Sequence, residues 1–69
     1  MNTERLFTII LMDFSLEKLK IEEELQNVIN SDTVVGEKLS TIKSLVNRLV
    51  SIDASIVKFT ELTNTNKND

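Results

Sequence analysis

The sequence predicts an all-α fold: an antiparallel, coiled-coil-like hairpin of two helices that pairs with a second copy into a four-helix bundle. Three observations support this fold class. The chain of 69 residues has no proline and one glycine, which favours long helices with few turns. Apolar residues recur every seven positions in both halves of the chain. A short polar stretch at residues 30–33 separates the two halves.

The apolar heptads define a seam along which the two predicted helices face each other. The seam contains Phe7, Phe14, Ile21 and Val28 in the first half, and Val35, Ile42, Leu49 and Ile56 in the second. If the chain folds back near residues 31 and 32, facing residues have numbers that add up to 63. This register pairs Phe7 with Ile56, Phe14 with Leu49, Ile21 with Ile42, and Val28 with Val35.

The first helix is expected at about residues 4–30. Thr3 is a suitable N-cap, and Glu4 places an anion in the first turn, where the helix dipole favours it. The first half of this helix is apolar on more than one side. A second stripe, spaced by three and four residues, lies roughly opposite the seam and contains Ile9, Met12, Leu16 and Leu19.

A turn is expected at residues 30–33, because asparagine, serine and aspartate favour turns and N-caps. Ser31, Asp32 and Thr33 are all candidates to cap the second helix. Gly36 lies either in the first turn of that helix or in a longer loop. The short connection fits the pairing of the seam and the antiparallel arrangement better.

The second helix is expected at about residues 34–62. Leu45, Ile52 and Phe59 complete its side of the seam. Residues 64–69 are polar and show no periodicity, so they are expected to form a disordered tail. Residues 1–63 therefore make up a single helical-hairpin domain.

Two lysines interrupt the seam in this register. Lys18 falls opposite Leu45, and Lys38 falls opposite Leu25. A lysine at such a position either helps to fix the register or extends its long side chain along the apolar surface to reach water.

A hairpin of this size buries only one stripe of each helix. Small domains compensate with disulfides, metal sites or oligomerisation. Because the chain has no cysteine and no histidine, we expect it to form a homodimer. The predicted interaction surface contains Ile9, Met12, Leu16, Leu19, Leu39, Val46, Val50 and Val57.

The composition disfavours catalysis and metal binding. The serines have no histidine to activate them, and an unactivated hydroxyl is a weak nucleophile. The run Glu22, Glu23 and Glu24 is the densest charge feature, but consecutive helical residues point about 100° apart and do not converge on one ion. We therefore predict no catalytic residue, no cofactor and no metal site. An exposed ion pair between Glu17 and Arg48 is also expected across the hairpin.

The charge and hydropathy patterns also bear on partners and location. The net charge of −3 argues against nucleic-acid binding, which requires clustered lysine and arginine. The apolar run at residues 6–12 is far shorter than the roughly 20 residues of a membrane span, and no signal-peptide pattern surrounds it. The polar face of the first helix lacks the basic residues of an interfacial membrane helix. We expect a cytoplasmic protein.

The predicted function is that of a non-enzymatic, self-associating helical hairpin that interacts with proteins. The alternative is a small regulator or inhibitor, encoded by a phage or a bacterium, that binds a host protein through the apolar surface of the first helix. A lesser alternative is a hairpin dimer that binds nucleic acid.

Overall fold

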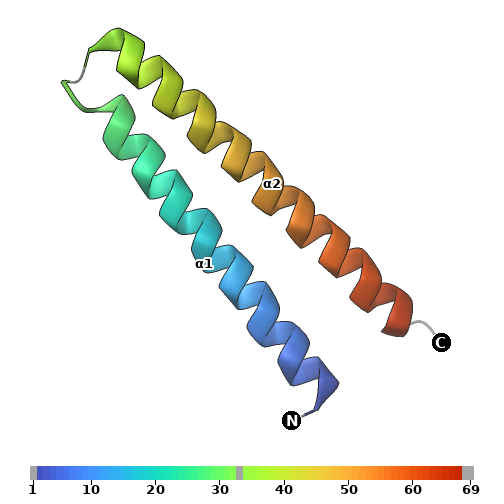
Figure 1. The fold of residues 1–69 in the computed structure, drawn as a ribbon. Helices are drawn as coiled ribbons and strands as arrows, with labels where there is room; N and C mark the ends of the chain where they lie inside the picture. The colour runs from blue at the N-terminus through green and yellow to red at the C-terminus, as the bar shows by residue number, and fades with distance from the viewer. Residues whose placement is uncertain (1, 33, 68–69) are drawn as a thin grey trace.

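The computed structural model describes residues 2–32 and 34–67. It consists of two helices, α1 (Thr3–Ile29) and α2 (Val35–Lys67), that pack side by side as a hairpin (Figure 1). The described chain contains no strand, so the predicted all-helical fold is confirmed. The hairpin is narrow, with extents of 53 × 18 × 12 Å. Helix α1 begins and α2 ends at the same end, which we call the open end.

The N-terminus of α1 is capped by Asn2. Its backbone is extended, and its side-chain Oδ1 accepts a hydrogen bond from the backbone N–H of Arg5 at 2.8 Å. The prediction that Thr3 is the cap was wrong, because Thr3 is already the first helical residue. Asparagine is among the strongest N-cap residues, and capping at Asn2 gives the helix one residue more. Helix α1 ends at Ile29, close to its predicted end.

The connection between the helices is short, as expected, but none of the predicted candidates caps α2 in the described chain. Helix α2 begins at Val35, and the carbonyl of Val34 accepts the N–H of Lys38 at 3.0 Å. Val34 therefore holds the N-cap position, and it has no side-chain acceptor to offer. Ser31 instead donates its hydroxyl to the carbonyl of Val28 at 2.8 Å. Thr33 lies outside the described residues.

Helix α2 runs to Lys67 and is longer than predicted. Residues 64–67 were expected to belong to a disordered tail, and this expectation was wrong; residues 68 and 69 lie outside the described chain. Thr63 is buried, with 8% of its surface exposed, and its hydroxyl donates to the carbonyl of Thr60 at 3.1 Å. The packed seam thus extends past the predicted end of the helix at residue 62, and packing supports helical structure there.

The core is a single row of side chains between the helices. Ile21 and Leu45 are its buried apolar members, with 6% and 3% of their surfaces exposed. Toward the open end, Phe59 packs edge-on against two rings of α1. Its ring centroid lies 5.5 Å from that of Phe7 and 6.2 Å from that of Phe14. Such edge-to-face pairs add about 0.5–1.5 kcal/mol each beyond the area they bury.

The register of the seam differs from the predicted one by about seven residues. In the predicted register Phe59 would face Glu4, whereas its ring lies between Phe7 and Phe14. Near the turn, the Nζ atom of Lys38 donates to the carbonyl of Ile29 at 3.0 Å, so Lys38 does not lie opposite Leu25.

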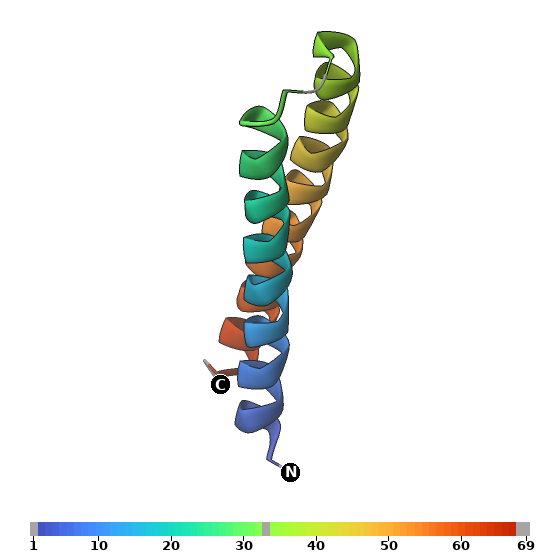
Figure 2. The same cartoon turned by 90° about the vertical axis from the view of Figure 1, so that its left-hand side faces the viewer.

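Val35 reflects the same shift, because 78% of its surface is exposed and it does not complete the seam with Val28. Figure 2 shows the same offset at the turn, where the first turn of α2 extends past the end of α1.

An ion pair between the helices is consistent with the shifted register. Sliding one helix by a full heptad keeps apolar residues opposite apolar residues, so periodicity alone does not choose between the two registers. The predicted register would set Lys18 against Leu45 and Asp53 against Ile10. In the structure, Lys18 Nζ instead lies 2.8 Å from Asp53 Oδ1. The shift therefore pairs two charges that would otherwise meet apolar side chains.

Candidate protein-interaction surface

The eight residues predicted to form the interaction surface are all exposed in the hairpin. Their exposed fractions range from 41% for Val46 to 67% for Met12. A single exposed apolar residue is common on protein surfaces. Eight of them at helical spacing on a small chain form extended apolar surfaces. They divide into one stripe on each helix.

The α1 stripe consists of Ile9, Met12, Leu16 and Leu19. These side chains surround a shallow, mostly apolar depression, whose margin includes Thr8, Asp13 and Ser15. The depression lies on α1 alone and is open to solvent. It therefore offers a surface for another helix or an apolar segment rather than an enclosed site for a small molecule.

The α2 stripe contains four apolar residues, Leu39, Val46, Val50 and Val57, and two charged ones, Lys43 and Asp53. Each of these six residues comes immediately after a residue of the seam that faces α1. Successive members are four, three, four, three and four residues apart, which is the spacing of a coiled-coil seam. All six are at least partly exposed. Helix α2 thus has two seams, one packed against α1 and one without a partner in the hairpin.

An ion pair joins the helices at the edge of the α2 stripe. Asp53 accepts a hydrogen bond from Lys18, and both side chains are partly exposed. The hydrogen bond and the charge of Asp53 raise the pKa of Lys18 above its ordinary value of 10.5, with a smaller contribution from Glu22. The lysine is therefore held in its charged form across the physiological pH range.

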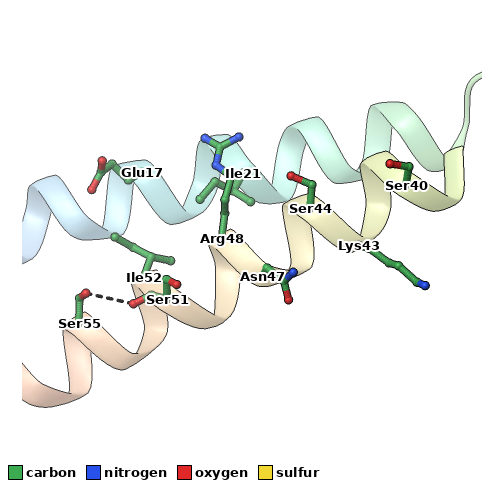
Figure 3. Close-up of a pocket in the computed structure, with 10 residues that line it drawn as sticks. All are labelled: Glu17, Ile21, Ser40, Lys43, Ser44, Asn47, Arg48, Ser51, Ile52 and Ser55. Atoms are coloured by element: carbon green, nitrogen blue, oxygen red, sulfur yellow. Dashed lines mark hydrogen bonds between the residues drawn. The ribbon is translucent and has the colours of Figure 1, made fainter. Parts of the chain in front are cut away.

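The opposite edge of the seam is polar. Arg48 lies 3.9 Å from Glu24 there, so its ion-pair partner is not Glu17 as predicted. Figure 3 shows Arg48 directed toward α1 above a shallow groove that Glu17 also lines. On α2 the groove is also lined by Ile52, by Lys43 at the border with the α2 stripe, and by the small polar side chains of Ser40, Ser44, Asn47, Ser51 and Ser55.

The two long faces of the hairpin therefore differ in chemistry. The face with the α2 stripe is apolar, interrupted by the Lys18–Asp53 pair, and the face in Figure 3 is rich in hydroxyl groups. The shared face of these five polar residues of α2 was not predicted from the sequence. Their spacing of three and four residues was the signal that could have revealed it.

Several exposed apolar residues lie outside the predicted surface. They are Leu6, Ile29, Val34, Val35 and Leu62. Val35 was assigned to the seam in the predicted register, and the heptad shift leaves it exposed. Ile29 lies at the last turn of α1, whose terminal carbonyl receives the lysine of α2. This positive charge at the C-terminus of α1 also complements the helix dipole.

The described residues show no cluster of three or more carboxylate, histidine or cysteine side chains placed to hold a metal ion. Neither α1 nor α2 contains a window long and apolar enough to traverse a bilayer. Comparison with known proteins gives no family model, no curated protein and no solved structure that matches this chain.

Proposed function

We propose that this chain is a non-enzymatic interaction module that self-associates as a helical hairpin through its exposed apolar stripes. The observation that carries the proposal is the second seam on α2, an exposed coiled-coil pattern on a helix that already packs against α1 by its first seam. The chain contains no cysteine, which suits a reducing compartment, and the proposal locates the module in the cytoplasm.

The small core supports the proposal. Ile21 and Leu45 are the two apolar side chains of the described hairpin that are buried, and most other seam residues are only half-buried. A two-helix core of this kind has little stability of its own, because a domain of this size buries little surface for each residue that it orders. Pairing two hairpins would cover exposed apolar surface and add a second packed helix to the small core.

Two neighbouring residues of α2 provide a matched test. Leu49 belongs to the packed seam and Val50 to the exposed stripe. Sedimentation equilibrium of the unmodified chain should give the mass of a dimer. Val50→Asp should yield a folded monomer or a dimer weakened by more than tenfold, because a charge would be buried between copies.

Leu49→Asp should instead abolish the helical circular-dichroism signal. Asn47→Asp, on the polar face, is the charge-matched control and should leave both properties unchanged.

A monomeric unmodified chain at all accessible concentrations would contradict self-association. Equal effects of Leu49→Asp and Val50→Asp on folding would contradict the assignment of the two seams.

The α1 stripe supports a second candidate function, in which the hairpin regulates a different protein. The depression around Met12 and Leu16 is formed by α1 alone, so a foreign apolar helix could bind it while α2 is paired elsewhere. The test is Leu16→Asp in a tagged chain used to capture proteins from a lysate of the source cells. Loss of one stoichiometric partner, with the dimer intact, would support the regulator. No partner with either form would leave self-association as the sole proposal.

A further inference from the structure

The spacing of the α2 stripe is compatible with pairing about a two-fold axis, and its residue types decide whether such pairing is favourable. Its six positions are 39, 43, 46, 50, 53 and 57, and their spacings read the same from either end. The midpoint lies at Arg48, whose own side chain points away from the stripe toward α1. Two antiparallel copies of this helix, related by a two-fold axis at that midpoint, would therefore bring the stripe of one copy onto the stripe of the other.

The residue types obey the same symmetry. Across such an axis Leu39 faces the partner's Val57, and Val46 faces the partner's Val50. The remaining pair places Lys43 opposite the partner's Asp53. The two charged residues of the stripe therefore meet a charge of opposite sign. A two-fold interface must be self-complementary in this way, because each contact occurs twice. One more position at either end sets Gly36 opposite the partner's Thr60, and neither residue obstructs a close approach.

We infer that two copies pair through α2, which packs antiparallel against the partner's α2 with its centre near Arg48. This inference rests on the proposed self-association and specifies its geometry. The turns of the two hairpins then lie at opposite ends of the assembly. Lys43 approaches the partner's Asp53 on each side of the axis, and the Lys18–Asp53 pair becomes a three-residue charge network.

The rival arrangement places both turns at the same end, so that α1 of one copy packs on the partner's α2. The face of α1 that would then meet the stripe is less suitable, since Ser15, Glu22 and Gln26 accompany Leu19 between Met12 and Ile29. Glu22 would lie against the partner's valines. A carboxylate in an apolar interface costs free energy unless it is paired, and the α2–α2 arrangement avoids that contact.

Disulfide cross-linking distinguishes the arrangements, because the chain has no cysteine of its own. Three full-length variants are needed: Leu39→Cys, Val57→Cys and Met12→Cys. An equimolar mixture of the first two should form a covalent heterodimer in a glutathione redox buffer. Each variant alone should form far less, because like positions lie about 27 Å apart across the axis. The rival arrangement predicts cross-linking in the mixture of Met12→Cys with Val57→Cys instead.

A charge reversal provides a second readout that leaves the packed seam intact. Lys43→Glu sets glutamate opposite aspartate twice per dimer, so the dissociation constant should rise on the order of tenfold. Lys20→Glu changes the net charge equally, but position 20 lies outside the stripe, and it should have little effect.

The possible results separate this inference from the function on which it rests. Cross-linking between positions 39 and 57, together with weakening by Lys43→Glu, supports the α2–α2 geometry. A dimer that cross-links between positions 12 and 57, or at neither pair, overturns the geometry and leaves self-association standing. A chain that sediments as a monomer and does not cross-link overturns both.

Discussion

Val34 holds the N-cap position of α2, although valine is among the poorest residues there because its side chain accepts no hydrogen bond. Glu37 lies three residues later, in the first turn. The substitution Val34→Ser would therefore complete a capping box. The serine oxygen would accept a hydrogen bond from the N–H of Glu37, and the glutamate side chain would accept one from the N–H of residue 34.

We expect Val34→Ser to raise the free energy of unfolding by about 1 kcal/mol. Thermal unfolding followed by circular dichroism should show an increase of roughly 4–8 °C. Val34→Ala is the matched control, since it removes the same exposed apolar side chain without adding an acceptor. A stabilisation by alanine as large as that by serine would show that capping is not the cause.

Lys18 makes stability depend on pH in the alkaline range. Its pKa is raised in the folded state, mainly by the hydrogen bond to Asp53 and by the charge of that carboxylate. The folded state therefore holds this proton more tightly than the unfolded state. The resulting stabilisation is fully present below the ordinary pKa of 10.5 and is lost as the pH rises through the higher folded value.

The lysine titration can be followed by NMR from the Cε and Nζ resonances of Lys18. We expect its pKa to fall toward the ordinary value in Asp53→Asn, because the amide keeps a hydrogen-bond acceptor but loses the charge. Glu61→Gln, which alters a carboxylate that pairs with Lys58, should leave the titration of Lys18 unchanged.

The register between α1 and α2 is the feature of the fold that sequence reasoning predicted wrongly. The seven-residue recurrence of Phe7, Phe14 and Ile21 predicted the two helices and most of their seam. It did not predict which heptad of one helix faces which heptad of the other, since a shift by seven residues keeps apolar residues facing each other along most of the seam. Specific pairs such as Lys18–Asp53 decide between registers, and such pairs become evident only when the helices are placed side by side.

A pair of alanine substitutions tests the observed register. Phe59→Ala removes the ring between Phe7 and Phe14 and should lower the free energy of unfolding by about 3 kcal/mol, enough to unfold much of so small a domain. Val35→Ala should leave stability unchanged or slightly raised, because Val35 is exposed and alanine is the better helix former. Urea denaturation of both variants provides the measurement. In the predicted register Val35 would be buried against Val28, so Val35→Ala would also lower the free energy of unfolding.

At the scale of the assembly, the exposed apolar surface could be predicted from the sequence, but its role could not. Exposure of Met12, Leu19 and Val50 follows from helical spacing once the seam is known, and the structure confirms that these side chains are exposed. Their role as an interface stays a prediction. The polar face around Ser44 and Ser51 was not predicted, although the spacing of three and four residues that aligns these side chains on α2 is present in the sequence.

The open end of the hairpin has a consequence for anything attached to it. In the inferred α2–α2 geometry the paired hairpins would act as a rigid spacer, with their attachment points directed away from each other. Fluorescent dyes on a cysteine introduced at Thr3 would then be separated by roughly 50 Å, given the helical rise and the 53 Å length of one hairpin. With a dye pair whose Förster distance is much shorter than this separation, energy transfer between the dyes should be weak. Strong energy transfer would mean that the labelled ends of the two copies lie close together, contrary to the α2–α2 geometry.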